Sequence, residues 1–500
     1  MARGCVAAGT GAVPREHRPG HRARALSWRP ERTTARAPLP PPPSEPRTPM
    51  TSEQVVEETP QARRREQRGW YFYDWANSAF PTTVLTVFLG PYLTTIAETA
   101  AQGRPYVDVL GFDVRPSAYY SFVVGSAAIL QIILMPVAGA LADHTGRKKE
   151  LMGLFAYLGA GATLCFWFVA DGRYLLGGAL FLVANVAFAA AFVIYNSFLP
   201  EIATADERDR VSAQGWGFGY LGGGLLLAFH LALFLKHKSF GVTEGEAVRI
   251  ALASAGLWWG GFTVIPLLRL RNRRALAPGA ETAAQAVTGS FRQLGRTIRE
   301  LRRYPLTLGF LVAYLIYNDG VQTVISFSAT YADKELGLDQ TVRIAAILMV
   351  QFVAFFGALL LGRLAGSYGA KRVVMVALIA WVAVVAVAYF LPKGSAGPFF
   401  ALGFAIAIVM GGTQALSRSL FSHVIPRGKE AEYYSLYEIS DKGSTFLGSF
   451  TLGLALQLTD SYRLGIISLV IFFVLGFVLL ALIDLPKAIR AAGNQVPERL

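Results

Sequence analysis

Charged residues are scarce in this sequence, and long stretches of the chain have almost none. Only 16% of the residues are Asp, Glu, Lys or Arg, whereas 53% are hydrophobic. Soluble domains contain roughly 25% charged residues, because a surface in water requires them. We therefore expect that lipid surrounds most of this chain.

The sequence also lacks the patterns that build disulfide frameworks, metal centres and catalytic sites. Its two cysteines are Cys5, near the start, and Cys165, inside an apolar run, so no disulfide framework is expected. The six histidines show no metal-ligand pairing at helical spacing. There is no His-Glu-x-x-His motif, serine elbow or cofactor loop. We expect no metal, no cofactor and no enzymatic activity.

The formal net charge of +14 does not indicate a nucleic-acid partner. The basic residues lie in the N-terminal tail and in alternate loops between apolar segments, and no RNA-binding or zinc-finger motif accompanies them. The tail, residues 1–69, is basic and Pro-rich, which is typical of disorder. Because Met50 is followed by polar residues of the kind found at ordinary N-termini, we expect translation to begin at Met50. Residues 1–49 would then not be part of the native protein. N-terminal sequencing tests this.

Twelve apolar segments follow the tail, and each is long enough to cross a membrane. About 20 mostly apolar residues, rising 1.5 Å each, span a hydrocarbon core of about 30 Å. The segments are 70–97, 117–141, 150–170, 174–198, 211–235, 247–269, 306–331, 342–366, 372–391, 398–422, 433–459 and 463–484. The sequence predicts an all-α, multi-pass protein of the cell membrane. Since Lys and Arg gather in the tail and in every second loop, both termini, including residues 487–500, are predicted to be cytoplasmic.

The longest loop between segments, residues 270–304, divides the twelve into six and six. Four apolar residues of this loop share one helical face among arginines: Phe291, Leu294, Ile298 and Leu301. This pattern indicates a basic amphipathic helix on the inner leaflet; a solvated linker is the alternative. The prediction is thus one six-helix bundle at 70–269 and a second at 305–486.

An internal repeat supports this division. Gly139–Lys149, after the second segment, matches Gly362–Arg372, after the eighth, in its paired glycines, its Leu-Ala pair and its terminal basic pair. At nearly the same offset, Pro200 and Tyr220–Gly222 match Pro426 and Phe446–Gly448. We infer that the two halves arose by duplication.

The loop Gly139–Lys149 resembles the signature loop of the major facilitator superfamily. Together with it, Trp70–Phe80, Tyr317–Thr323 and Gln414–Ser419 resemble the branch that contains the autophagy-related vacuolar amino-acid effluxers and their bacterial relatives. The likeness covers about residues 68–486. It implies the major facilitator fold, with two bundles that rock about a central site, and an ion gradient that drives a small-molecule substrate.

The resemblance also implies that the signature loop closes one side of the transporter. Its candidate gating residues are Gly139, Asp143, Gly146, Arg147 and Lys148. The two glycines permit a tight turn, and Asp143 and Arg147 can pair across the loop or reach the other half. The second copy has Gly366 and Ala370 at the matching positions, so we expect such a gating pair only in the first half.

Polar residues inside two of the segments lie on single helical faces. In 70–97, Asp74 and Asn77 share a face; Asp74 is either a proton or substrate carboxylate or an interfacial acid near a helix N-terminus. In 306–331, Asn318 and Gln322 are in register, with Asp319 beside them, deep in the segment. An acid at this depth marks a site by default, although neighbouring hydroxyls and amides could also satisfy it.

Two further groups are candidates. In 433–459, Glu438 and Lys442 are spaced for an ion pair, which is either a packing element or a switch. Near the end of 398–422, Arg418 either extends to the membrane interface or binds a substrate carboxylate through two hydrogen bonds. Gly215, Gly219 and Gly223 repeat every four residues, which predicts close helix packing.

We expect a secondary transporter, a monomer, that works by alternating access with proton coupling. A pocket with acids, a lysine and an arginine suits a small zwitterion such as an amino acid. A drug/proton antiporter of the same fold is the first alternative, and a membrane receptor or scaffold is the second. Uptake that persisted in an Asp319→Asn variant would exclude Asp319 as the coupling residue.

Overall fold

The computed structural model describes residues 59–273, 295–297, 299–443 and 445–500, without the side chains of 442–446. Residues 1–49 lie outside this part of the chain, as do residues 291–294 and 298 of the predicted amphipathic helix. Of that helix, residues 295–297 and 299–301 are described and are helical. The described helical residues pack toward the second half, since Thr297 donates a hydrogen bond to Glu432.

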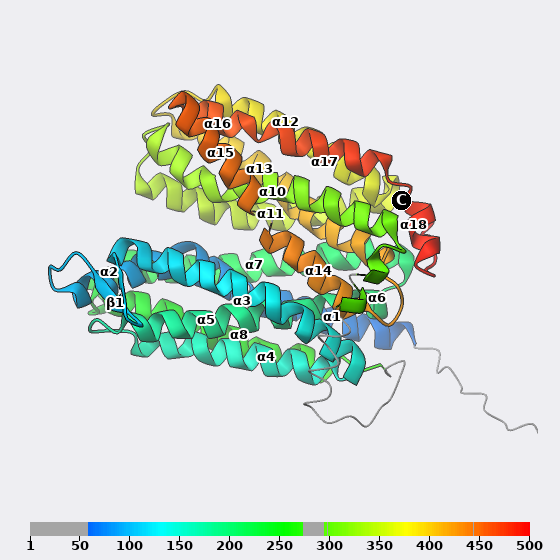
Figure 1. Ribbon diagram of the computed structural model, residues 1–500, viewed down its shortest axis with the longest axis horizontal. Coiled ribbons are helices and arrows are strands. Elements are labelled where there is room, and N and C mark those ends of the chain that lie inside the picture. Colours follow the sequence, from blue (N-terminus) through cyan, green and yellow to red (C-terminus); the bar gives the residue numbers. More distant parts are fainter. Residues whose placement is uncertain (1–58, 274–294, 298, 444) are drawn as a thin grey trace, which may run out of the picture. The chain divides into compact units, whose positions relative to one another are not determined.

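Helices account for nearly all of the first half (Figure 1). In chain order they are α1 (Pro60–Asn77), the π-helix η1 (Phe80–Phe88), α2 (Leu89–Ala101), α3 (Pro116–Thr145), α4 (Lys148–Leu164), the 3₁₀-helix η2 (Cys165–Phe168), α5 (Tyr174–Ser197), α6 (Leu199–Ile202), the 3₁₀-helix η3 (Ala205–Glu207), α7 (Arg208–Leu235), the 3₁₀-helix η4 (His237–Phe240) and α8 (Glu244–Arg269).

The second half consists of helices as well. They are α10 (Pro305–Lys334), α11 (Gln340–Tyr368), α12 (Ala370–Tyr389), α13 (Ala396–His423), α14 (Glu430–Gly443), α15 (Thr445–Thr459), α16 (Tyr462–Ser468), α17 (Val470–Leu482) and α18 (Leu485–Ala491).

Eleven helices in the described part of the chain are long and apolar enough to cross a membrane. They correspond to eleven of the twelve predicted segments. The remaining one, 433–459, includes residue 444, which the structure does not describe; on either side of it lie α14 and α15, and the apolar stretch Leu447–Thr459 belongs to α15. The first helix also begins earlier than predicted, at Pro60 rather than at residue 70. Proline is well suited to the first turn of a helix.

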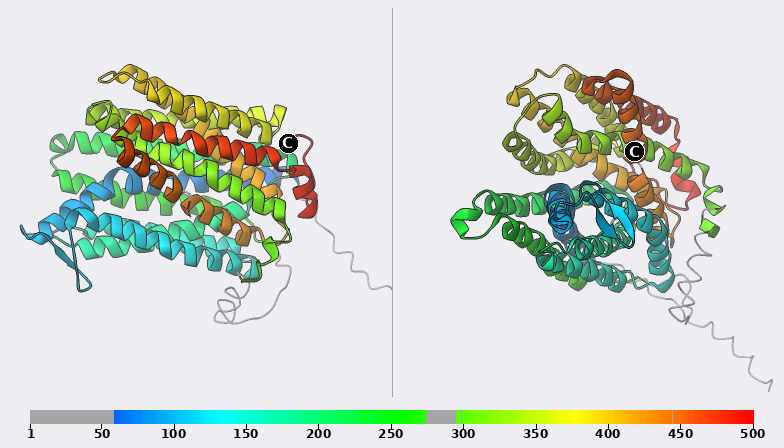
Figure 2. Two further views of the ribbon diagram at one scale, coloured as in Figure 1. Left: turned by 45° about the horizontal axis from the view of Figure 1, so that its top comes forward. Right: turned by 60° about the vertical axis from the view of Figure 1, so that its left-hand side comes forward.

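Each half has its own hydrophobic core. One cluster of buried residues is drawn almost entirely from positions 70–270, and the other from positions 301–489. Between the halves, α7 lies beside α11 and α13, and α3 lies beside α14 (Figures 1 and 2). The division into two six-helix bundles stays a prediction, and the residues between the two cores are the first place to seek a central site.

Two features depart from a plain helical bundle. A hairpin of two short strands, β1 (Val107–Val109) and β2 (Phe112–Val114), separates α2 from α3 in the otherwise helical fold, and the sequence did not predict it. The turn is possible because Leu110 and Gly111 both adopt positive φ. In the first segment, nine residues from Phe80 form a π-helix, a conformation that is frequent at functional sites.

The repeat inferred from the sequence recurs in the backbone. Gly146 ends α3 with φ +63°, and Gly369 ends α11 with φ +90°, conformations that glycine adopts at little cost. We call the end of the bundles that carries these two turns the loop end. The end with β1 and β2 is the hairpin end (Figure 1).

Candidate functional site

A cluster of charged side chains joins the halves at the loop end. The Nζ atom of Lys148 lies 2.9 Å from Asp143, 2.6 Å from Glu201 and 3.2 Å from Glu430. The first three residues belong to the first half, and Glu430 begins α14 in the second. The Lys148 side chain is only 9% exposed, so its charge attracts these carboxylates in a medium that screens weakly.

Asp143 makes a second contact across the same boundary. Its Oδ2 atom accepts a hydrogen bond of 2.9 Å from the backbone N–H of Glu432, in the first turn of α14. Unpaired N–H groups and the helix dipole favour an anion at this position. One turn earlier on α3, a Cβ atom on Gly139 would lie 2.5 Å from the carbonyl oxygen of Ala431. Gly139 therefore lets α3 touch the backbone of α14.

These contacts refine the predicted gate. Asp143 reaches the other half, as one of the two alternatives proposed. Its ionic partner is Lys148, whereas the side chain of Arg147 is exposed and forms no ion pair with a described residue. Gly366 contributes no carboxylate to the second copy, and its carbonyl oxygen accepts a hydrogen bond from Arg499.

Deeper in the bundles, Asp74 on α1 and Arg418 on α13 form a second connection between the halves. Arg418 Nη1 lies 3.3 Å from Asp74 Oδ2, and the two side chains are 1% and 5% exposed. Tyr195 donates a hydrogen bond of 2.6 Å to the same oxygen. The purely structural alternatives do not fit, because Arg418 is buried in an ion pair and Asp74 lies several turns after the start of α1.

Several residues that the sequence did not single out complete the surroundings of Arg418. Its Nε atom donates to Ser212 Oγ at 2.9 Å, and its Nη1 atom donates to Asn196 Oδ1 at 3.2 Å. The guanidinium lies 4.7 Å from the ring centroid of Trp70 and 5.4 Å from that of Trp216. The sequence signal that could have indicated some of these residues is a polar Asn or Tyr in the otherwise apolar segment 174–198.

The glycine stripe of α7 makes this approach possible. A Cβ atom on Gly215 would lie 2.6 Å from the Trp70 ring and 2.7 Å from Asp74 Oδ2, and one on Gly219 would lie 2.7 Å from Ser78 Oγ. The predicted close packing is confirmed, and it is against α1.

Two adjoining cavities lie between the halves. The inner one, of about 260 Å³, is lined by Asp74, Asn77, Arg418, Glu438 and Asp441 among others. The outer one, of about 590 Å³, lies in the hairpin-end half of the helices and is mostly apolar. Ser78, Trp216, Gln322 and Gln414 line both. Cavities of about 300–1,000 Å³ hold small ligands.

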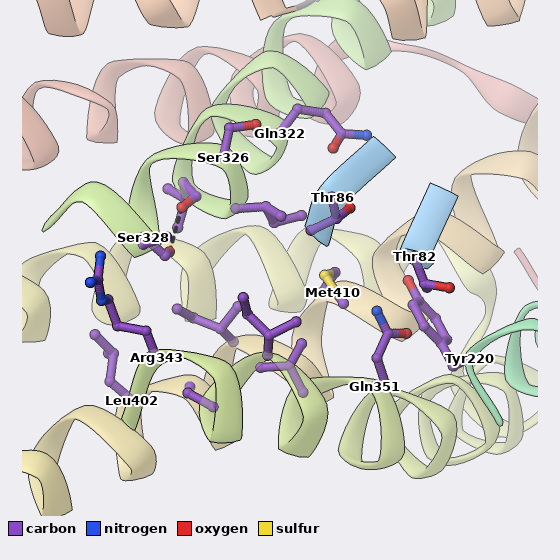
Figure 3. Close-up of a pocket in the computed structure, with 18 of the residues that line it drawn as sticks. Thr82, Thr86, Tyr220, Gln322, Ser326, Ser328, Arg343, Gln351, Leu402 and Met410 are labelled. Carbon is purple, nitrogen blue, oxygen red and sulfur yellow. Dashed lines mark hydrogen bonds between the residues drawn. The ribbon is translucent and has the colours of Figure 1, made fainter. Parts of the chain in front are cut away.

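Figure 3 shows the outer cavity with the polar side chains that line it. Arg343 of α11 is on one side, and Tyr220 of α7 is on the other. Arg343 is the one charged residue among those that line this cavity, and it forms an ion pair of 3.1 Å with Asp333. The charges of the two cavities are therefore concentrated at the inner one.

The polar stripe of α10 converges on Asp441 of α14. Asn318 donates to Asp441 Oδ1 at 2.8 Å, and Tyr314 and Gln322 donate to the same atom at 3.3 Å. Glu438, one turn before Asp441, accepts a hydrogen bond of 2.9 Å from Asn196 of the first half. The side chain of Lys442 lies outside the described residues, so its predicted pair with Glu438 stays a prediction.

Asp319 does not face the inner or the outer cavity. It is fully buried and turned toward α15, where its Oδ2 atom accepts a hydrogen bond of 2.8 Å from the backbone N–H of Gly448. Asn77, by contrast, lines the inner cavity, and its Nδ2 atom has no hydrogen-bond partner in the described structure.

Two helical bundles around a polar cavity, closed at one end by a charged signature loop, define a transporter of the major facilitator superfamily. Solved structures agree on the fold. The fucose:proton symporter FucP of E. coli matches with TM-score 0.61 at 14% identity, over 84% of this chain and 97% of that one. A bacterial homologue of the iron transporter ferroportin matches with TM-score 0.58 at 16% identity, over 84% and 98%.

The chain belongs to the family described as "Vacuole effluxer Atg22 like", which it matches over residues 62–493. A relative in Bacillus subtilis, the "Uncharacterized MFS-type transporter YxiO", is 29% identical over 84% of this chain and 95% of its own length. Autophagy-related protein 22-1 of Penicillium rubens is 23% identical over 87% and 92%. The protein is thus a multi-pass membrane transporter and not an enzyme.

Proposed function

We propose that this transporter carries a small zwitterionic solute, in the first place an amino acid, across the cell membrane by proton-coupled alternating access. The observation that carries the proposal is the inner cavity, where the buried cation Arg418 and the acids Asp74, Glu438 and Asp441 surround one space. A zwitterion offers both charges that such a space can bind.

Arg418 is suited to bind the carboxylate of the solute. Its guanidinium is oriented by Ser212 and Asn196 and packed between aromatic rings, so little side-chain entropy is lost on binding. A carboxylate can form two parallel hydrogen bonds with it. In this mechanism the solute replaces Asp74 as the partner of Arg418, and its ammonium group contacts Asp441, which already accepts hydrogen bonds from α10.

The outer cavity supplies space for an apolar substituent. It adjoins the inner one at Trp216 and Gln414 and is lined by side chains such as Val350, Phe399 and Met410. Burial of apolar groups there contributes about 25 cal/mol per Å². An amino acid with a large apolar side chain fits both cavities better than a sugar does.

The contacts at the loop end correspond to the state of alternating access in which this end is closed. The cluster around Lys148 holds the halves together at that end, and the pair Asp74–Arg418 joins them deeper in the bundles. The larger cavity lies toward the hairpin end. The excess of Lys and Arg in the loops of the loop end supports a cytoplasmic location for it. The solute would then enter or leave this state on the opposite side of the membrane.

Purified protein in detergent tests the proposal, first by thermal shift against amino acids, peptides, sugars and common antibiotics. Solutes that raise the unfolding temperature are then assayed by counterflow in proteoliposomes. We expect saturable counterflow of at least one amino acid, and a loss of more than tenfold in Arg418→Gln. If no amino acid shifts the unfolding temperature or exchanges, the proposed substrate class is wrong.

A drug/proton antiporter is the second candidate, and the apolar lining of the outer cavity favours it. A lipophilic cation could occupy that cavity and direct its charge toward Asp441. The Arg418→Gln variant distinguishes the two, because a cation does not need the arginine. Counterflow of a cationic drug should persist in that variant, whereas counterflow of an amino acid should not.

A further inference from the structure

Residues 493–500, which we call the strap, follow α18 at the loop end and form neither helix nor strand (Figure 1). Gly493 ends α18 with φ +76°. Its N–H donates to the carbonyl oxygen of Arg490, and the N–H of Asn494 donates to that of Ile489. These two bonds form a Schellman motif, which satisfies the last carbonyls of a helix. The direction in which the strap leaves α18 is therefore fixed by the fold.

The strap is held mainly by the second half. The Nδ2 atom of Asn494 donates to the carbonyl oxygens of His423 and Ile425 at the end of α13, at 2.9 Å and 2.7 Å. Three apolar side chains of the strap are buried or pack against the core of that half: Val496, Pro497 and Leu500. This attachment combines hydrogen bonds with apolar burial.

Arg499 of the strap lies on the end of α11. Its Nη1 atom donates to the carbonyl oxygens of Gly366 and Ser367, both at 3.1 Å. The last four carbonyls of a helix have no partner within it, and the helix dipole favours a cation beside them. A Cβ atom on Gly369, in the turn after α11, would overlap the backbone of Leu500. The strap thus covers the end of α11 and the turn that follows.

At Glu498 the strap contacts the first half. The backbone N–H of Glu498 donates a hydrogen bond of 2.8 Å to Oδ1 of Asp206, which belongs to η3. The next residue, Arg499, is bound to the second half. Two consecutive residues of the strap therefore connect the two halves, and the halves cannot separate on this side of the loop end while both contacts persist.

The positions that the strap connects have counterparts in the internal repeat. Gly366 stands where the first copy of the signature loop has Asp143. Asp206 corresponds to Glu432, because each lies six residues after one of the two matching prolines. The strap therefore contacts the second copy of a pair of positions that also meets in the first copy.

The two copies of this pair are joined in different ways. In the first copy, Asp143 accepts a hydrogen bond directly from the N–H of Glu432. In the second copy, Gly366 has no side chain with which to reach Asp206. The strap connects these two positions instead, so the second side of the loop end is closed by a segment from the end of the chain.

We propose that the strap is a second closing element of the loop end, which replaces the acid that the second copy of the signature loop lacks. It stabilises the closed state and lowers the fraction of molecules that are open at this end. For the end to open, Glu498 must leave Asp206. This contact is a single hydrogen bond between exposed residues, and such a bond contributes little net stability, so it breaks before the attachment to the second half.

The strap then moves with the second half as the loop end opens. That this opening is a step of transport rests on the proposed alternating access, whereas the binding of the strap to both halves does not.

The test measures opening without any solute, so its outcome is independent of the proposed substrate. Spin labels at the exposed positions Arg210 and Arg372, one in each half, report the distance across this side of the loop end. The full chain is used in proteoliposomes, in a background without Cys5 and Cys165. A pair at Arg147 and Arg210, within the first half, is the control.

Glu498→Pro removes the N–H that Asp206 accepts, whereas Glu498→Ala keeps it and is the matched control. We expect Glu498→Pro to enlarge the population at longer distance about threefold to tenfold, the range that the loss of one hydrogen bond implies. A chain that ends at Gln495 loses both contacts and should open at least as often. Glu498→Ala should match the parent, and the distance within the first half should not change.

A second measurement keeps the strap intact. Amide hydrogen exchange of the strap, followed by mass spectrometry, reports whether the N–H of Glu498 is bonded. Asp206→Ala, at an exposed position, should accelerate this exchange at least threefold, and Arg210→Ala should not.

The proposal is overturned if Glu498→Pro or the shortened chain keeps the parental distance distribution, or if Glu498→Ala changes it as much as Glu498→Pro does. It is also overturned if the strap exchanges equally fast in the wild type and in Asp206→Ala. A failure of the proposed substrate class would leave all of these measurements unchanged.

Discussion

Asp74 and Arg418 place two opposite charges deep inside the protein, each on a different half. Removal of one partner of a buried pair is costly because the other charge is left without compensation. Here the remaining charge would be an arginine that is 1% exposed. At the scale of single residues, this ion pair stabilises the contact between the halves. We also propose that the solute competes with Asp74 for Arg418.

Asp74→Asn should therefore destabilise the protein by about 3–5 kcal/mol, although the side chain keeps its shape. Arg418→Gln alone should be similarly costly, whereas the double variant should lose clearly less than the sum of the two. Thermal or denaturant unfolding of all four proteins in the same detergent measures this coupling. Additive losses would mean that the two charges do not interact in the membrane.

The faces of the polar residues could be predicted from the sequence, but their partners could not. Helical periodicity places Asn318 and Gln322 on one side of a helix, and the structure confirms it. Nothing in that periodicity indicates that this side meets Asp441 or that Asp319 turns toward α15. Contacts between helices depend on packing that residue spacing does not encode.

At the scale of elements, the loop end is closed by the approach of α3 to α14. The approach is closest at Gly139, where a side chain would meet the backbone of Ala431. Backbone atoms cannot move aside as a flexible side chain can, so any larger residue forces the helices apart. Overpacking of this kind typically costs about 1–3 kcal/mol.

Gly139→Ala should thus shift the protein toward the state that is open at the loop end. Labelling of a cysteine at Ala431 should become at least several-fold faster, in a background without Cys5 and Cys165. Gly125→Ala on the same helix is the control, because no atom lies within 4 Å of its added Cβ. Equal labelling rates in the two variants would contradict a packing role for Gly139.

The sequence predicted the long helices better than the short elements between them. Hydropathy is a local property, and eleven predicted segments recur as long apolar helices. The hairpin of β1 and β2 was missed because its strands are three residues long.

At the scale of the whole molecule, the halves are held at the loop end by one lysine and several carboxylates. Lys148 balances Asp143, Glu201 and Glu430 together. In Lys148→Gln these acids repel one another at short range, which weakens the attachment of α14 to the first half. We expect a larger fraction of molecules open at the loop end, and a reduced rate of solute counterflow.

Lys149→Gln is the control, since the described contact of that residue uses its backbone N–H. Labelling of a cysteine at Glu432, inside the contact with Asp143, should accelerate several-fold in Lys148→Gln and remain unchanged in Lys149→Gln. If both variants label as slowly as the parent, the charged cluster does not hold the gate.

The most direct test of alternating access is the distance across the loop end in the working protein. Spin labels at the exposed positions Arg147 and Arg427 report on it in proteoliposomes, and a pair at Arg147 and Arg210 within the first half is the control. A transported solute should add a population at longer distance for the first pair alone, and Lys148→Gln should enlarge it. One unchanged distance for Arg147–Arg427 while counterflow proceeds would contradict the account.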